Sequence, residues 1–319
     1  MEETIRQFHT QFEWKPIVEN KEKLPPAKRF VVGGMGGSHL AAGLLICWKP
    51  DIDLLIHRDY GLSLVSDAKK RLHIAISFSG NTEEVLDFAE QALARNLPLA
   101  VIAKGGKLLL FARKHALPYV ELPPTKIQPR SGLGFQMLAL AALLQDASLS
   151  KELSQLASVL KPDKLEGKGE ALAGALRGKV PVVYASARNN AVAYNWKIKF
   201  NETGKIPAFY NVIPEMNHNE MTGFDVISAT AGLSRKLHFI FLTDTADHPQ
   251  NQKRMRVTKK MYEKRGLSVT EVPLEGQTTL ERIFSSLLIA DWTALHLSKI
   301  YGTEAEQVPM VEQFKKMIS

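Results

Sequence analysis

The sequence contains one cysteine, Cys47, in 319 residues. A single cysteine cannot form a disulfide within the chain, which excludes the small disulfide-stapled proteins of oxidising compartments. Cys47 lies in an apolar stretch that is typical of a helix, so we expect it to be an inert core residue in a reducing compartment.

Long apolar runs are also missing. A membrane-spanning helix needs about 18 or more consecutive apolar residues. The longest runs here, Leu40–Trp48 and Leu133–Leu144, are shorter and are interrupted by Gly43 and Gln136, so we expect no membrane partner. The first residues, Met1–Thr4, lack the basic-then-apolar order of a secretion signal, which favours a cytoplasmic protein.

The charge balance is basic, with 41 Lys and Arg against 33 Asp and Glu and a formal net charge of +8. This excess favours an anionic partner, either a phosphate ester or a nucleic acid. The densest basic segment, Lys253–Lys260, has no helix-turn-helix, zinc-finger or aromatic-plus-basic signature beside it. We interpret it as a solvated amphipathic helix with Met255 and Met261 turned inward, and we expect no nucleic-acid partner.

The hydrophobic share of 45% and the length indicate a globular protein of two domains. In both halves short apolar runs alternate with stretches of helical periodicity, as a parallel sheet covered on both faces requires. The predicted fold class is therefore α/β, with two consecutive doubly wound α/β/α sandwiches. We expect first-half strands at 30–32, 54–57, 72–76, 98–103 and 119–122, and helices at 37–47, 83–95, 106–115 and 133–145.

The same pattern returns after a segment that is poorer in apolar residues, 148–179. We place the boundary in that segment, with an N-terminal domain at 1–150 and a C-terminal domain at 151–319. The second half should hold strands at 181–185, 208–212, 238–243 and 268–272, and helices at 189–203, 250–265 and 278–300.

A glycine-rich turn, Gly33–Ser38, follows the first expected strand. Glycines let the backbone approach a ligand closely, and the N–H groups of the following helix favour an anion. A dinucleotide site with Asp53 or Asp59 on the ribose fits poorly, because His39 stands where that fingerprint needs its third glycine. A purely structural tight turn stays open.

Hydroxyl groups gather after the third expected strand, at Ser77, Ser79 and Thr82. Together with a helix N-terminus they can surround a phosphate with neutral donors. The competing interpretation is a capping box, in which Asn81 caps the helix and Glu84 returns the hydrogen bond.

Arg130 follows Pro129 just before the helix expected at 133–145. A guanidinium fixed there could stabilise a developing oxyanion. The alternative is an ordinary surface arginine.

Glu202 falls in the last turn of the helix expected at 189–203, and we expect Gly204 to end that helix. A carboxylate there opposes the helix dipole at a cost of about 0.3–1 kcal/mol, an arrangement that suits a general base. The alternative is a surface glutamate neutralised by Lys199 or Lys205.

His218 lies in the polar loop Pro214–Glu220 between two asparagines, so it is either simply exposed or a proton-transfer group. A metal site built from Asp244, Asp247 and His248 is conceivable, but no ligand spacing supports it, and we expect no metal.

Together these motifs resemble a known family. Gly34–Ser38, Ser77–Thr82 and Pro129–Arg130 are similar to the sugar isomerase (SIS) domain. Phe200–Glu202 and Pro214–Asn219 are similar to the bifunctional phosphoglucose/phosphomannose isomerases. Since the order and spacing agree, the resemblance extends over nearly the whole chain.

The resemblance implies a cytoplasmic homodimer of two SIS-type domains that acts in glycolysis and gluconeogenesis without metal or nucleotide cofactor. It implies interconversion of glucose 6-phosphate, and of mannose 6-phosphate as a further aldose, with fructose 6-phosphate. The N-terminal domain would hold the phosphate and the C-terminal domain the base and the histidine. The implied substrate-binding residues are Ser77, Ser79 and Thr82 for the phosphate and Gly36, Gly37 and Ser38 for the sugar.

The resemblance also implies the catalytic roles. Glu202 would move a proton between C1 and C2, and Arg130 would stabilise the enediolate. His218, reached from the neighbouring subunit, would open the sugar ring with Lys315. Val308 stands where the compared members have a threonine, a departure that bears on whether mannose 6-phosphate is a substrate.

Two other functions stay open. SIS domains also serve as non-catalytic sugar-phosphate sensors, but a sensor has no use for a base such as Glu202, and we find no attached DNA-binding segment. The second alternative is an isomerase of the same fold that acts on another sugar phosphate.

Overall fold

The computed structural model describes residues 1–318. The chain folds into two compact units, a first unit of Gln7–Leu160 and a second unit of Met1–Arg6 with the chain from Lys161 onward. No helix in the described residues is long and apolar enough to cross a membrane.

The units meet in sequence at 160–161, inside the predicted boundary segment but ten residues after the expected division at 150. Residue 150 falls within helix α6 (Ala147–Val159), which buries Leu149, Leu153 and Leu156. Because these leucines pack in the first unit, the whole helix stays with it.

The first six residues belong to the second unit, an arrangement that no sequence pattern predicted. Arg6, at the end of α1 (Glu2–Arg6), forms ion pairs with Asp163 and Glu166. Its guanidinium also lies 4.9 Å from the centre of the Trp292 ring. These charge contacts hold the N-terminal helix on the second unit.

The first unit is built on the predicted five-stranded parallel sheet, and its strand order is β2-β1-β3-β4-β5. Its strands are β1 (Arg29–Gly34), β2 (Asp53–His57), β3 (Leu72–Ser77), β4 (Leu99–Ala103) and β5 (Tyr119–Glu121). All six residues of β3 are buried, which is typical of a central strand covered on both faces.

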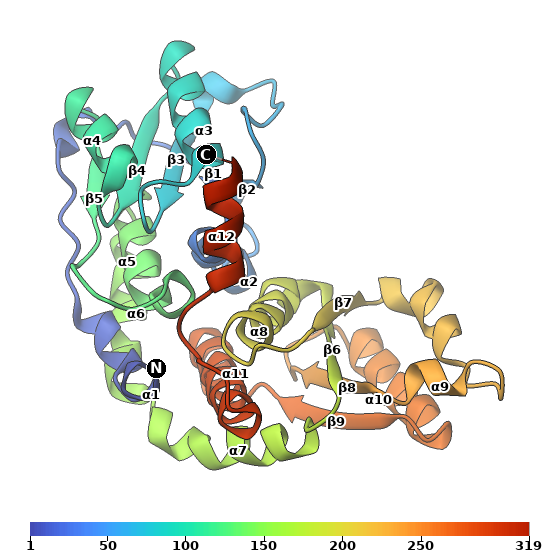
Figure 1. Cartoon of the computed structure of the whole chain (residues 1–319). Helices are drawn as coiled ribbons and strands as arrows, with labels where there is room; N and C mark the ends of the chain where they lie inside the picture. Colours follow the sequence, from blue (N-terminus) through green and yellow to red (C-terminus); the bar gives the residue numbers. More distant parts are fainter. Residues whose placement is uncertain (319) are drawn as a thin grey trace. The chain divides into compact units, whose positions relative to one another are not determined.

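The helices of the first unit are α2 (Leu40–Trp48), α3 (Glu83–Ala94), α4 (Gly106–Lys114), α5 (Leu133–Leu143) and α6 (Figure 1). Val31, Ala75 and Val101 of the sheet share one apolar core with Phe88 of α3 and Leu108 of α4. Helices α2 and α5 pack together, and Cys47 of α2 is buried as predicted.

The second unit repeats the architecture with a four-stranded parallel sheet in the order β7-β6-β8-β9. The strands are β6 (Val180–Ser186), β7 (Phe209–Ile213), β8 (Leu237–Thr243) and β9 (Ser268–Pro273). After α1, its helices are α7 (Glu166–Ala175), α8 (Asn190–Glu202), the short α9 (Ala231–Ser234), α10 (Pro249–Lys264), α11 (Thr279–Tyr301) and α12 (Pro309–Ile318).

Helix α10 is the predicted basic amphipathic helix. Met255 is buried against the sheet with Phe239 and Phe241, and Met261 is half-buried. On the other side, α11 packs against α7 and α8. The two predicted α/β sandwiches are therefore confirmed.

Candidate active site

Three loops of the first unit meet at the carboxyl edge of its sheet. They are the 3₁₀ turn after β1 (η3, Gly36–Ser38), the turn after β3 and the 3₁₀ turn before α5 (η5, Pro129–Ser131). The Ser38 Oγ accepts a hydrogen bond from the Phe78 N–H at 2.9 Å. A Cβ at Gly37 would lie 2.9 Å from the backbone nitrogen of Arg130, so only glycine permits this approach. The structure thus brings together all the residues predicted here to bind the phosphate and the sugar, with Arg130 beside them.

The hydroxyl groups after β3 form one cluster. The Oγ of the buried Ser77 lies 2.8 Å from Thr82 Oγ1 and accepts the Gly80 N–H at 3.0 Å. Ser79 is exposed and accepts the Asn81 N–H at 3.3 Å. The cluster therefore presents hydroxyls at the start of α3, where an anion is favoured.

The capping-box interpretation of this turn is wrong. Thr82 is the N-cap of α3, and its side chain makes no capping hydrogen bond. The Asn81 Oδ1 instead accepts the N–H of Lys107 in α4 at 3.0 Å. The Thr82 hydroxyl and the Asn81 amide are thus engaged with Ser77 at the end of β3 and with the start of α4, rather than with α3.

Arg130 is buried, with 1% of its surface exposed, so the surface-arginine alternative is wrong. Its turn is held by two glutamines that the sequence analysis did not assign. The Gln11 Nε2 donates to the Ser131 carbonyl at 2.8 Å, and the Gln136 Nε2 donates to the Pro129 carbonyl at 2.9 Å. In the sequence, Gln136 could have been recognised as functionally placed because it is a polar residue inside the apolar run of α5.

Glu202 is the last residue of α8 and is half-buried. Lys199, one turn earlier, is buried and forms an ion pair with Asp291 of α11 at 2.6 Å. Its ammonium therefore neutralises Asp291 in the core rather than Glu202. The Lys205 ammonium donates to the Glu202 backbone carbonyl at 2.6 Å.

The expectation that Gly204 caps this helix is wrong, because α8 ends at Glu202 and its C-cap is Thr203. The residue with left-handed backbone is Lys205, with φ 56°. Glycine is needed at 204 for a different reason, because a Cβ there would lie 2.9 Å from the Phe200 carbonyl oxygen.

His218 is exposed in the 3₁₀ turn η8 (Glu215–His218), which follows β7. The carboxyl ends of β6 and β7 are paired, Ser186 with Ile213, so His218 lies beyond the carboxyl edge of the second sheet. Helix α8 starts at that same edge and runs back for 13 residues, or about 20 Å, which puts Glu202 at the amino edge. Within one chain the structure does not bring Glu202 and His218 together.

Lys315 is exposed on α12 and pairs with Glu312 at 2.9 Å. None of the residues that α12 comprises is buried. Lys316 is its exposed neighbour on the same helix.

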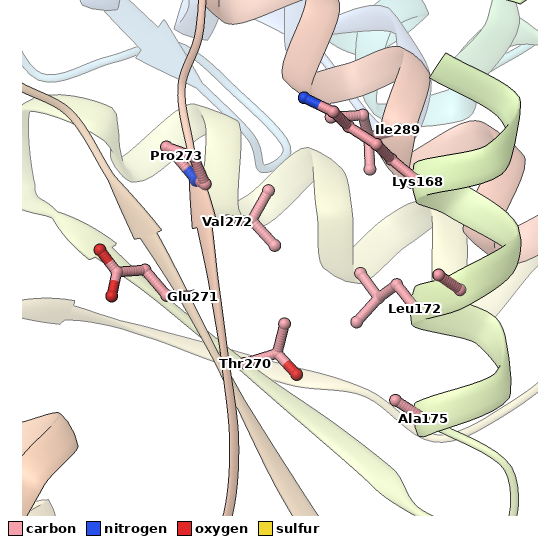
Figure 2. A pocket seen from close by; sticks show the side chains of 9 residues that line it. Lys168, Leu172, Ala175, Thr270, Glu271, Val272, Pro273 and Ile289 are labelled. Atoms are coloured by element: carbon pink, nitrogen blue, oxygen red, sulfur yellow. The ribbon is translucent and has the colours of Figure 1, made fainter. Parts of the chain in front are cut away.

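Two cavities of the second unit have no predicted site residue in their lining. A cavity of about 430 Å³ lies among α7, β9 and α11, and Figure 2 shows Leu172, Thr270 and Val272 at its wall with Lys168 and Glu271 at its margin. A second cavity of about 260 Å³ is lined by residues of 217–225 and by Met261, Tyr262 and Arg265.

The residues considered for a metal have other partners. Asp247 accepts the Ser186 hydroxyl at 2.6 Å, Asp244 lies 3.4 Å from the Arg282 Nε, and the His248 Nδ1 accepts the Gln250 N–H. Among residues 1–318 no group of three or more His, Cys, Asp or Glu side chains is placed to hold a metal ion.

A solved structure and a family model both match this chain. A hypothetical protein from Thermus thermophilus matches with a TM-score of 0.73 at 18% identity, over 99% of this chain and 89% of that chain. The model of the bacterial phospho-glucose isomerase C-terminal SIS domain matches residues 165–318. The fold and the three-loop site define a protein with two sugar isomerase domains.

Relatives that are similar in sequence place the chain in one family within this class. The bifunctional phosphoglucose/phosphomannose isomerase of Aquifex aeolicus is 32% identical over 98% of this chain and 96% of its own. The enzyme of that name from Caldicellulosiruptor bescii is 32% identical over 91% of this chain and 89% of its own. The chain belongs to the bifunctional phosphoglucose/phosphomannose isomerase family.

Proposed function

We propose that this protein is a phosphosugar isomerase that interconverts glucose 6-phosphate and fructose 6-phosphate, with mannose 6-phosphate as a second aldose substrate. The observation that carries the proposal is the similarity to an isomerase of that name along 98% of the chain. The convergence of three loops at the edge of the first sheet supports it independently.

Ser77, Ser79 and Thr82 bind the phosphate in this proposal. Their hydroxyls and the N–H groups at the start of α3 are neutral donors, which suit a phosphate dianion at a helix N-terminus. Gly36, Gly37 and Ser38 line the sugar, because Gly37 lets this turn pack directly against the Arg130 turn and the space beside Gly36 is open.

Glu202 is the proposed base. Its carboxylate removes the proton from C2 of the open-chain aldose, the C2–H electron pair forms the C1–C2 double bond, and the C1 oxygen gains the charge. The proton of the C2 hydroxyl then passes to the C1 oxygen, and the electron pair left on the C2 oxygen forms the C2 carbonyl. At the same time the electron pair of the C1–C2 double bond takes the proton back from Glu202 at C1, which gives the ketose with no net oxidation. The buried guanidinium of Arg130 stabilises the enediolate, since a fixed charge out of water acts strongly.

His218 and Lys315 open the sugar ring in this proposal, and the active site is shared within a homodimer. The support is the separation of Glu202 and His218 at opposite edges of one sheet. A histidine from a second copy satisfies the chemistry that one chain leaves incomplete.

The test compares wild type with Glu202→Gln in a coupled assay for fructose 6-phosphate, with a metal chelator present. We expect turnover from glucose 6-phosphate and from mannose 6-phosphate in wild type. In Glu202→Gln, turnover should fall by roughly 10²–10⁴-fold while calorimetry still detects substrate binding. The control is Glu263→Gln, which changes an exposed glutamate of α10.

Full turnover in a folded Glu202→Gln protein would sink the assignment of the base. Turnover of glucose 6-phosphate alone would keep the mechanism and give Val308 a role in specificity, to be checked with Val308→Thr. A folded wild-type protein that binds sugar phosphates without isomerising any of them would be a sensor.

A further inference from the structure

Residues 215–224, which carry His218, are fastened to the rest of the second unit at four places. Met216 is fully buried, and Phe224 packs edge-on against Phe239 with ring centres 4.9 Å apart. Between these two apolar anchors the chain turns through η8 and η9 (Glu220–Phe224), and His218 lies on the exposed side.

The third anchor is the carboxylate of Glu220, two residues after His218. The hydroxyl of Tyr184 in β6 donates to Glu220 Oε1 at 2.5 Å. The side-chain amide of Asn211 in β7 donates to Glu220 Oε2. One carboxylate therefore ties the segment to two neighbouring strands.

Packing alone does not hold this part of the segment. The cavity of about 260 Å³ is lined by Asn217, Met221 and Phe224 together with Tyr262, so apolar contact beneath η8 and η9 is incomplete. Asn217 adds one hydrogen bond, from its Nδ2 to Thr258 of α10 at 2.8 Å. Hydrogen bonds to buried partners thus carry much of the constraint on the turn.

Tyr184 is suited to this role because it stays a donor. Its side chain is fully buried, and burial is the main cause that raises the pKa of the phenol far above its usual range. Tyr262 and Glu220 raise that pKa further. The phenol therefore remains protonated while the carboxylate accepts from it.

We infer that Glu220, held by Tyr184 and Asn211, is a positioning residue that sets the place and direction of His218 for ring opening. The inference rests on the proposed function, because it takes His218 as the ring-opening group. Displacing a proton-transfer group by about 1 Å can lower the rate up to a hundredfold. An exposed histidine therefore needs neighbouring contacts that hold its backbone in place.

The test is a double-mutant cycle between Tyr184→Phe and His218→Ala, with kcat and KM measured on glucose 6-phosphate. Tyr184→Phe keeps the buried ring and removes one hydrogen bond to Glu220. We expect kcat to fall about tenfold with KM nearly unchanged. In the His218→Ala background the same change should cause no further loss, since the group being positioned is absent.

Tyr262→Phe is the matched control. It removes a buried hydroxyl from the same aromatic cluster, whereas the hydrogen bonds to the two oxygens of the Glu220 carboxylate come from Tyr184 and Asn211. Its kcat should equal that of wild type. Asn211→Ala removes the other donor to Glu220 and provides a second cycle if Tyr184→Phe fails to fold.

An equal loss from Tyr184→Phe in both backgrounds would mean a general structural effect and would overturn the inference, as would no loss in either. Failure of the proposed function would look different. Wild type would then be inactive, or His218→Ala would have normal turnover, even with Tyr184 and Asn211 unchanged.

Discussion

At the scale of single residues, Gly80 is the tightest point of the turn after β3, the proposed phosphate site. Its φ is +74°, and a Cβ would lie 1.7 Å from the Gly105 carbonyl oxygen, so no other residue fits. The close approach sets the start of α4 against the turn that holds Ser79 and Asn81. The sequence showed a glycine in a turn, whereas its partner at Gly105 follows only from the fold.

Thr82 provides the sharpest test of phosphate binding. Thr82→Val keeps the shape and removes a hydroxyl that lies 2.8 Å from Ser77 Oγ. Because a hydrogen bond to a charged group contributes about 1.5–3 kcal/mol, KM for glucose 6-phosphate should rise about tenfold or more, with kcat little changed. Thr82→Ser keeps the hydroxyl and should behave as wild type. An unchanged KM in Thr82→Val would count against the phosphate site.

At the scale of elements, the C-terminal end of α8 is fixed by a buried ion pair. Lys199 and Asp291 are 1% and 4% exposed, and their charged groups lie 2.6 Å apart between α8 and α11. Lys199 precedes Glu202 by one helical turn, so the pair also sets where the proposed base lies.

Removing one partner of this pair should be far worse than replacing both. Asp291→Ala leaves a buried ammonium without its carboxylate and should lower the free energy of unfolding by about 3–5 kcal/mol. The double variant Lys199→Met, Asp291→Leu should recover most of that loss, as judged by urea unfolding. A double variant as unstable as Asp291→Ala would show that volume, not charge, decides the effect.

Helix α7 shows why some elements could not be predicted. Its sequence includes Gly167, Gly169 and Gly174, and glycine disfavours a helix by about 1 kcal/mol per residue. The helix forms because Leu172 and Ala173 are buried and because Gly169 allows close contact, where a Cβ would lie 2.3 Å from the Trp292 Cβ. Tertiary contact with α11 overrides local preference. The strands, by contrast, were predictable because continuous apolar runs such as β3 need burial on both faces.

At the scale of the whole molecule, the separation of Glu202 and His218 links the proposed mechanism to the assembly of subunits. If the site is shared, a mixture of Glu202→Gln and His218→Ala chains should regain activity, because each mixed dimer holds one intact pair. Random exchange in equal amounts should restore about a quarter of wild-type activity. No recovery after proven exchange of subunits would place the whole site in one chain.

Buried histidines should make the fold sensitive to acid. Burial lowers the pKa of His39 and of His238 to about 4, with smaller effects of Arg58 and Lys179, and burial also lowers the pKa of His73. In the unfolded chain a histidine has a pKa of about 6.5. As pH falls from about 6.5 towards 4, the unfolded state binds protons first, so stability is lost over that window.

Thermal unfolding between pH 7 and pH 4 measures this effect. The midpoint should fall steadily below pH 6.5, and His238→Gln should reduce the fall because one titrating group is gone. His115→Gln, which changes an exposed histidine, is the control. The expectation fails if His238→Gln and His115→Gln give the same pH dependence.

The sequence by itself determined the two α/β sandwiches and the order of their strands along the chain, and it supplied the candidate site residues on which the proposed mechanism rests. Apolar periodicity and the local motifs at strand ends carry this information, and both are read along the chain. Only the tertiary structure decided that Arg130 is buried, that Gln11 and Gln136 hold its turn, that Lys199 serves Asp291, and that Glu202 and His218 lie at opposite edges of one sheet. These facts depend on contacts between residues far apart in sequence, which no local pattern encodes.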